Sequence, residues 1–325
     1  MSTYKQIHGT DIEVLSSDPA NPVDGQVWYN STSNTVKANF INLGSWATGG
    51  SLNQARYALA GAGADNTTAL GFGGFGPGAP ATGLTESYDG TSWTEVNDLN
   101  TGRYFLAGTG TQTAALGFGG DYPGTPEFFA GTETWNGTSW TEVNDLNTAR
   151  KGMGGAGTNT ATLGFGGITV PGAPTIFSET ESWNGTNWTE VNDLNTARRN
   201  MGSAGTNTAA LAFGGFAPPT TGATESWNGT SWTEVNDMNT ARVELGSSGA
   251  TNTAALGFGG GTPGANTESW NGTSWTEVND MGTARYGLAG TGTATAALGF
   301  GGYFPASTAT EEWNAGPQTV TFTDS

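Results

Sequence analysis

The sequence predicts an all-β fold, a six-bladed β-propeller, from three observations. First, one segment recurs almost literally: TETWNGTSWTEVNDLNTAR, which ends at Arg150, returns as TESWNGTNWTEVNDLNTAR, which ends at Arg198. Second, each copy carries an apolar stretch that ends in Phe-Gly-Gly, and no helical periodicity competes with these short strand-like patterns. Third, the copies follow one another at 43 to 48 residues, a period typical of propeller blades, and six arginines mark them: Arg56, Arg103, Arg150, Arg198, Arg242 and Arg285.

Each copy is expected to form four short strands, a to d. Strand a follows the arginine, and its Ala, Gly and Ser residues suit the crowded centre of a ring. Strand b is the apolar stretch before Gly-Gly, strand c is T-E-S-W, and strand d is S-W-T-E-V, joined to c by a tight N-G-T turn. One such blade cannot bury both of its faces, so the blades must stack around an axis.

The ring is predicted to close by combining the two ends of the repeat region. The sixth copy runs to Trp313 and then loses the pattern, because N-A-G-P-Q-T-V replaces N-G-T-S-W-T-E. The missing strand d is present before the first copy, where Trp46 precedes Arg56 at the spacing that strand-d tryptophans keep in the other copies. We therefore expect residues 42–48 to pair with residues 310–314, which leaves no free sheet edge.

The repeat resembles a known family in four features. An arginine opens strand a, Gly-Gly closes strand b, an aromatic residue lies on strand c, and a tryptophan lies on strand d; over residues 41–314 this pattern resembles the kelch repeat. The resemblance implies a propeller for residues 41–325 without implying one function, since propellers include enzymes, adaptors and binding proteins. The strand-c aromatics are Tyr88, Trp135, Trp183, Trp227, Trp270 and Trp313, and the strand-d tryptophans are Trp46, Trp93, Trp140, Trp188, Trp232 and Trp275.

Residues 1–40 lie outside the repeat. The segment D-P-A-N-P-V-D-G-Q-V-W-Y-N-S-T-S-N-T-V-K predicts a hairpin of Val27–Asn30 and Thr35–Ala38, and residues 1–24 are expected to form an extended arm. This segment is similar to a short module near the N-termini of bacteriophage tail and fibre proteins. The similarity implies a role in virion attachment or assembly, with other virion proteins as partners of the arm.

Each marker arginine is predicted to pair with a glutamate on strand c. This glutamate stands two residues before the strand-c aromatic and shares its strand face, which we expect to lie between blades, where a charge needs a partner. Six such glutamates match the six arginines, whereas the corresponding strand-d glutamates number five. The strand-c glutamates are Glu86, Glu133, Glu181, Glu225, Glu268 and Glu311.

Composition narrows the classes of partner. The formal charge of −18 argues against nucleic acid, because phosphate contacts need a basic surface. No stretch has the ~20 apolar residues of a membrane helix, so no membrane insertion is expected, and the first residues lack the apolar core of a secretory signal. There is no cysteine, and the one histidine, His8, lies in the N-terminal arm.

The recurring acids are interpreted as repeat architecture rather than catalytic groups. Five identical copies of one acid do not make a single asymmetric active site, so we expect no enzyme and no cofactor or metal. Kelch-like copper oxidases need Cys and His, which the propeller lacks; a glycosidase with two carboxylates and adventitious calcium binding stay open. The Asp of V-N-D-L is expected to accept backbone N–H bonds in the turn to the next blade. These acids are Glu95, Glu142, Glu190, Glu234, Glu277, Asp98, Asp145, Asp193, Asp237 and Asp280.

The six copies differ mainly in the b–c loop and in the residue pair after each arginine. In a four-stranded meander both lie on one face of the disc, and loops that vary on a rigid scaffold are where recognition usually resides. The b–c loops are 75–84, 121–131, 168–179, 216–223, 261–266 and 303–309. The pairs are Tyr57-Ala58, Tyr104-Phe105, Lys151-Gly152, Arg199-Asn200, Val243-Glu244 and Tyr286-Gly287.

Candidate binding residues are the tyrosines and basic residues of this face. A tyrosine ring can stack on a sugar while its hydroxyl stays hydrogen-bonded. The candidates are Tyr57, Tyr104, Phe105, Tyr122, Lys151, Arg199, Tyr286 and Tyr303. For the phenylalanines of the b–c loops, an alternative role is to cover blade edges: Phe75, Phe128, Phe129, Phe177, Phe216 and Phe304.

Two functions are compatible with this pattern, both without catalysis and both in a virion. One is a phage tail-fibre or tail-tip protein whose variable face binds a host-surface glycan or protein. The other is a structural or decoration protein whose face docks another virion protein. A cellular kelch adaptor is a third class, although no helical partner domain is attached. A homo-oligomer is compatible with all three.

Overall fold

A computed structural model describes residues 12–20, 23, 25–77, 81–122, 128–169, 175–261 and 264–322, without the side chains of 40–42 and 317–321. The regular elements in these ranges are β-strands, and no helix there is long and apolar enough to cross a membrane. The chain divides into two compact units, Ser45–Asn314 and a second unit of Met1–Gly44 with Ala315–Ser325. The sequence analysis drew the boundary after residue 40, and it differs in giving residues 41–44 and 315–325 to the propeller.

The unit Ser45–Asn314 is a six-bladed β-propeller of antiparallel blades, each with four strands in the order a-b-c-d. Strands a are β4 (Ala60–Gly63), β8 (Ala107–Thr111), β12 (Gly154–Thr158), β18 (Gly202–Thr206), β22 (Gly246–Thr251) and β26 (Ala289–Gly292). Strands b are β5 (Ala69–Phe72), β9 (Ala114–Phe118), β13 (Ala161–Phe165), β19 (Ala209–Phe213), β23 (Ala254–Phe258) and β27 (Ala296–Phe300). Strands c are β6 (Thr85–Tyr88), β10 (Thr132–Trp135), β16 (Thr180–Trp183), β20 (Thr224–Trp227), β24 (Thr267–Trp270) and β28 (Thr310–Phe322). Strands d are β7 (Trp93–Val96), β11 (Trp140–Val143), β17 (Trp188–Val191), β21 (Trp232–Val235), β25 (Trp275–Val278) and, in the sixth blade, β3 (Thr35–Thr48).

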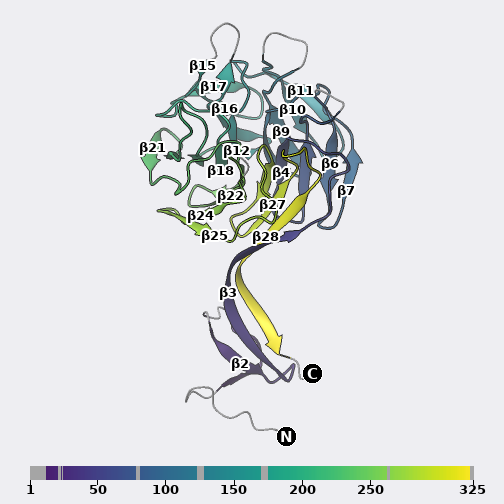
Figure 1. The fold of residues 1–325 in the computed structure, drawn as a ribbon, viewed down its shortest axis with the longest axis vertical. Helices are drawn as coiled ribbons and strands as arrows, with labels where there is room; N and C mark the ends of the chain where they lie inside the picture. Colours follow the sequence, from purple (N-terminus) through teal and green to yellow (C-terminus); the bar gives the residue numbers. More distant parts are fainter. Residues whose placement is uncertain are drawn as a thin grey trace. The chain divides into compact units, whose positions relative to one another are not determined.

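The six strands a form the inner ring, and the chain passes around it blade by blade (Figure 1). Neighbouring strands a contact one another in sequence order, and β26 contacts β4, which closes the ring. The approach is close enough to require glycine: a Cβ at Gly61 would lie 2.7 Å from Thr291 Cγ2 and 2.9 Å from Phe300 Cζ. The small residues of strand a are therefore explained by the crowding that the sequence predicts.

The sixth blade takes its outer strand from the start of the propeller, as predicted. Its four strands have the order β3-β28-β27-β26 within a six-stranded sheet, so β3 occupies the strand-d position beside β28. Next to this pair, the Gly49 backbone N–H donates to the Thr310 carbonyl at 2.9 Å. The rings of Trp46 and Trp313 lie 5.4 Å apart, as the Trp135 and Trp140 rings do in the second blade.

The blades are held together by the strand-d tryptophans. Each tryptophan donates its indole N–H to the first threonine of strand c in the preceding blade, as Trp140 does to Thr85 at 3.1 Å. Its ring packs on the last phenylalanine of strand b in that blade, as Trp140 does on Phe72 at 4.8 Å. The same two contacts recur at the other five junctions, with the donors Trp46, Trp93, Trp188, Trp232 and Trp275.

The six expected ion pairs between arginines and strand-c glutamates are present. In the first blade, Arg56 Nη2 lies 2.7 Å from Glu86 Oε1, and both side chains are 1% exposed. The second carboxylate oxygen accepts from the backbone and side-chain amides of Asn53, and Arg56 Nη1 donates to the Gly73 carbonyl. Burial lowers the pKa of Arg56, and the Glu86 charge opposes this shift. The remaining pairs are Arg103–Glu133, Arg150–Glu181, Arg198–Glu225, Arg242–Glu268 and Arg285–Glu311.

The recurring aspartates accept backbone hydrogen bonds, with a donor other than the one expected. The sequence suggested a cap on the turn into the next blade. In the structure, Asp98 Oδ1 accepts from the N–H of Thr85, the first residue of strand c in the same blade, at 3.1 Å. The reason is the c–d pairing, which sets the end of strand d beside the start of strand c. The same bond is made by Asp145, Asp193, Asp237 and Asp280.

The second unit contains the expected hairpin and one strand that the sequence analysis missed. β2 (Val27–Asn30) pairs with the start of β3, and β1 (Glu13–Leu15) adds to β2 in parallel, where an extended arm was predicted. Asp18 organises the unit, because its carboxylate accepts from Trp28 Nε1 and Asn30 Nδ2 and pairs with Lys37 Nζ at 2.6 Å. These bonds, led by that to Lys37, lower the pKa of Asp18 to about 2.

Candidate recognition face

The residues that follow Tyr57, Tyr104, Lys151, Arg199, Val243 and Tyr286 form a ring of backbone hydrogen bonds around the axis. Each donates its N–H to the carbonyl of its counterpart in the preceding blade, at 2.7–2.9 Å, and the last bond returns to the first residue. All six adopt left-handed conformations, with φ of 51–65°. The six residues, called the axial ring below, are Ala58, Phe105, Gly152, Asn200, Glu244 and Gly287.

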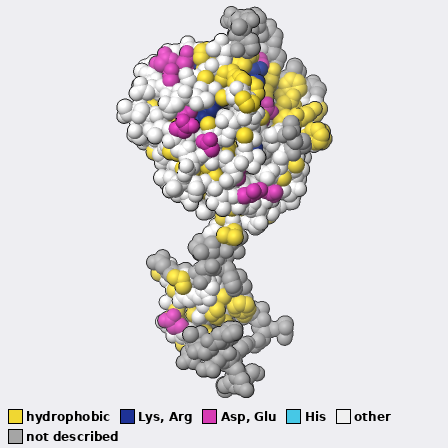
Figure 2. Space-filling view, turned by 60° about the vertical axis from the view of Figure 1, so that its left-hand side comes forward, with side chains coloured by type: hydrophobic (Ala, Val, Ile, Leu, Met, Phe, Trp, Pro, Cys, Tyr) yellow, Lys and Arg dark blue, Asp and Glu magenta, His cyan; other side chains and the backbone are white. Residues whose placement is uncertain are grey.

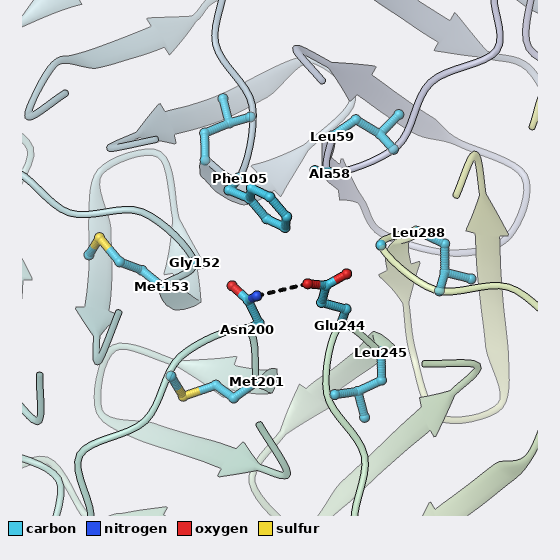
Figure 3. A pocket seen from close by; sticks show the side chains of 12 residues that line it. Ala58, Leu59, Phe105, Gly152, Met153, Asn200, Met201, Glu244, Leu245 and Leu288 are labelled. Carbon is cyan, nitrogen blue, oxygen red and sulfur yellow. Dashed lines mark hydrogen bonds between the residues drawn. The ribbon is translucent and has the colours of Figure 1, made fainter. Parts of the chain in front are cut away.

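The axial ring surrounds a small cavity of ≈ 90 Å³, called the axial pocket below. Leu59, Leu106, Met153, Met201, Leu245 and Leu288 line it together with the ring. Figure 3 shows the side chains of Phe105, Asn200 and Glu244 pointing toward the middle of the pocket. Asn200 Nδ2 donates to Glu244 Oε1 at 3.1 Å. Burial raises the pKa of Glu244, and the charge of Arg199 opposes this effect.

Beside this pocket, six aromatic rings form one connected chain over the first, second and sixth blades. Neighbouring ring centroids lie 4.9 to 5.6 Å apart, in the order Tyr286, Tyr303, Tyr57, Phe75, Tyr104 and Phe105. Tilted contacts at such distances are favourable for aromatic pairs. We call this chain the aromatic arc. It ends at Phe105, which also lines the axial pocket.

The backbone holds the arc by joining the two variable regions of the sequence. Tyr57 bridges Phe75, and Tyr286 bridges Tyr303, through single antiparallel β-bridges between the start of the blade and its b–c loop. The corresponding bridges of the second, third and fourth blades are Tyr104–Asp121, Lys151–Ile168 and Arg199–Phe216. The two variable regions therefore lie on one face, as the meander predicts.

Both basic candidate residues on this face interact with neighbouring side chains. Lys151 Nζ pairs with Asp121 Oδ2 at 2.5 Å and lies 4.4 Å from the centroid of the Phe128 ring. Arg199 stacks on Phe216, with Cζ 5.0 Å from the ring centroid. Asp121 also acts on Tyr104: burial, together with a hydrogen bond to this carboxylate, raises the pKa of Tyr104 to about 12.

The candidate residues do not all join the arc. Tyr57, Tyr104, Phe105, Tyr286 and Tyr303 form it, whereas Tyr122 packs on Phe129 at 6.3 Å. The Phe129 ring in turn lies against buried Arg103, 5.1 Å from Cζ, so it covers a blade edge as the alternative role requires. Phe304 is 64% exposed. Parts of the predicted b–c face fall outside the described residues: 78–80, 123–127, 170–174 and 262–263.

Four residues matter to this face that the site prediction omitted: Phe75, Asp121, Asn200 and Glu244. Asn200 and Glu244 are second members of the variable pairs, and their left-handed backbone is what turns their side chains inward. The signal was their departure from glycine, which occupies the equivalent positions 152 and 287. In the blade-3 loop, β14 (Ile168–Thr169) and β15 (Thr175–Ile176) form a two-stranded sheet that was not predicted.

The other end of the axis has a different character. A cavity of ≈ 350 Å³ there is lined by Gly, Ala, Ser and Thr residues of the strands a. No aromatic or charged side chain lines it, among the residues that the structure describes. Figure 2 shows one side of the molecule, on which hydrophobic side chains gather in one region close to basic ones, and acidic side chains lie at several separate places. Of the two cavities on the axis, the one at the b–c face is therefore the one lined by aromatic, amide and charged side chains.

The part of the chain that the structure describes holds no group of three or more His, Asp or Glu residues placed to bind a metal ion. No protein-family model matches the chain, and no curated protein matches it.

Proposed function

We propose that the chain is a non-enzymatic recognition protein that binds a host-surface glycan through the aromatic arc. The observation that carries this proposal is the arc itself, with tyrosines 57, 104, 286 and 303 on the variable face beside the axial pocket. Aromatic rings that combine an apolar face with a polar edge suit the alternating C–H and O–H groups of sugars. The kelch-like scaffold supplies a rigid base, and the sequence differences between blades lie mainly in the b–c loops and in the pairs after the arginines.

We further propose that the protein belongs to a bacteriophage virion, as part of a tail fibre or tail tip. The similarity of residues 1–40 to a module of phage tail and fibre proteins supports this. The Asp18 contacts add a physical reason for that motif, because the Asp, Trp and Asn of D-P-x(7)-V-W-Y-N meet in one hydrogen-bonded cluster. On this proposal the N-terminal unit attaches to other virion proteins and the propeller face meets the host.

Docking of a second virion protein on the same face is the competing function. Phe304 favours it, because an apolar side chain that is 64% exposed suits a protein interface. Both functions use the same side chains, so the choice depends on the partner that binds.

The test compares these two partners. The purified full-length protein is incubated with cell envelopes of candidate host bacteria and, separately, with virions that lack the protein. Host recognition predicts saturable binding to the envelopes that is lost when periodate oxidises their glycans and survives protease treatment. Binding to the virions through the propeller face, without binding to any envelope, would contradict the proposal and favour the docking role.

A further inference from the structure

Four residues of the axial ring are not glycine although their backbone conformation suits glycine. Gly152 and Gly287 make the same backbone hydrogen bonds as the others, so the ring does not need side chains there to close. A non-glycine residue in the left-handed region costs on the order of 1–3 kcal/mol, which is lower for Asn. Ala58, Phe105, Asn200 and Glu244 bear this cost, with φ of 51–58°. Three of these four residues, Phe105, Asn200 and Glu244, direct aromatic or polar side chains into the axial pocket.

Glu244 gives the pocket a negative charge that is only partly compensated. Its Oε1 accepts one hydrogen bond from Asn200. Arg199 acts on the carboxylate electrostatically, but among the described residues no ion pair joins the two. A half-buried carboxylate is stabilised by a cationic partner, since burial disfavours its charged form.

The other oxygen of this carboxylate lies on the side of the aromatic arc. A methyl group added at Gly287 would lie 3.7 Å from Glu244 Oε2 and also 3.7 Å from Tyr57 Cδ2. The Glu244 carboxylate and the Tyr57 ring are therefore both next to Gly287. The negative charge of Glu244 also contributes to the raised pKa values of Tyr57 and Tyr286, after burial. The axial pocket and the aromatic arc are thus two parts of one surface.

The size of the axial pocket limits what can enter it. Its volume is only ≈ 90 Å³. A sugar ring is too large for this space, whereas a single amino substituent fits. A primary ammonium group has three donors, which match Glu244 Oε2 and the Asn200 side-chain oxygen, and the face of Phe105 attracts a cation.

We propose that the axial pocket receives the protonated amine of an amino sugar whose ring stacks on Tyr57. This inference rests on the proposed function, because it names the class of glycan that the same face takes. The basic residues nearby do not argue for an anionic sugar, since Lys151 is already paired with Asp121 and Arg199 lies on Phe216. The one inward-pointing charge of the pocket is that of Glu244.

The test uses calorimetric titration of the full-length protein with size-matched oligosaccharides at about pH 6 and again at about pH 7, because burial raises the pKa of Glu244. The probes are the glucosamine trimer, the N-acetylglucosamine trimer, trigalacturonate and a trilysine peptide. Acetylation removes the charge of the amine and two of its three donors, so the glucosamine trimer should bind at least about tenfold more tightly than the acetylated one. Glu244→Gln should reduce this preference to within about twofold, since it removes the charge-assisted bond.

Glu234→Gln serves as the control, because it makes the same change of net charge at an exposed strand-d position. It should leave the preference unchanged. Equal affinities for the two trimers, or a preference that survives Glu244→Gln, would overturn the inference while leaving glycan recognition intact. Tighter binding of trigalacturonate, or Glu244-dependent binding of trilysine alone, would also overturn it. If no oligosaccharide binds and envelopes are not bound either, both the inference and the proposed function are wrong.

Discussion

Trp46 donates its indole N–H to Thr267 Oγ1 at 3.0 Å, across the junction between the sixth and fifth blades. Every other strand-d tryptophan makes this bond to the blade before it, and Trp46 also packs on Phe258 at 4.8 Å, as its counterparts do on theirs. A residue from the start of the propeller therefore completes its last blade. Because the ring lacks a free edge, its stability depends on this junction as much as on the others.

Trp46→Ala should lower the free energy of unfolding by about 3 kcal/mol or more, since loss of a large packed aromatic costs about 3–5 kcal/mol. Trp140→Ala, at the junction of the first two blades, is the matched comparison and should cost a similar amount. Urea unfolding followed by tryptophan fluorescence measures both. A loss below about 1 kcal/mol for Trp46→Ala, beside a large loss for Trp140→Ala, would mean that the ring does not depend on the N-terminal strand.

Arg198→Ala should destabilise the propeller by about 3–5 kcal/mol, because it leaves the buried carboxylate of Glu225 without its partner. Arg198→Ala combined with Glu225→Gln should cost less than the sum of the two single changes, since the double variant leaves no unpaired buried charge. Thermal or urea unfolding of the four proteins gives the coupling energy. Additive losses would show that the two side chains act independently.

The left-handed backbone conformation of the axial ring can be tested by substitutions at Gly287 and Glu244. In Gly287→Ala the added methyl would meet no atom closer than 3.6 Å, so the expected loss of about 1–2 kcal/mol comes from the backbone conformation alone. Glu244→Gly should raise stability by up to about 1 kcal/mol, because relief of the same strain exceeds the entropic cost of glycine. An unchanged Gly287→Ala protein would contradict the left-handed assignment.

Glu244 should make stability depend on pH in a defined direction. Its pKa is raised in the folded protein, mainly by burial, with Arg199 and Asn200 opposing the shift and Tyr57 and Tyr286 nearby. A raised pKa stabilises the fold below the unfolded value near 4.5, and this contribution is lost as the pH rises through the folded pKa. Glu244→Gln should therefore melt at a higher temperature than the wild type at pH 7, and the difference should vanish below about pH 4. A difference that is constant between pH 4 and pH 7 would exclude this titration.

The sequence was sufficient for the parts of the fold that repeat. The six arginines and Phe-Gly-Gly ends located the blades, and the loss of the strand-d pattern after Trp313 led to the pairing with β3. Counting charges was enough to pair Arg198 with Glu225. In each case the information came from comparing the six copies, or from the sixth copy, which lacks its own strand-d sequence.

For the parts that do not repeat, the sequence predicted where the variable residues lie but not the structure that they form. The pairs after the arginines were recognised as variable, but the axial ring was not, because Ala58, Phe105 and Glu244 give no local signal for a left-handed backbone. That conformation is imposed by hydrogen bonds to the neighbouring blades, which are tertiary contacts. The stacking of Phe75 between Tyr57 and Tyr104 depends on the same contacts, so it could not be distinguished from a blade-edge role by sequence alone.

Adsorption of face variants to host cells is the most direct measurement of whether the aromatic arc is a recognition surface. Tyr104→Ala and Tyr286→Ala should each reduce binding by about tenfold while the melting temperature changes little, since hot-spot aromatics at interfaces are worth on the order of 1–2 kcal/mol or more. Thr138→Ala, an exposed change in a c–d turn of the opposite face, should leave binding unchanged. Equal losses from both faces, or no loss from either tyrosine variant, would contradict recognition through the aromatic arc.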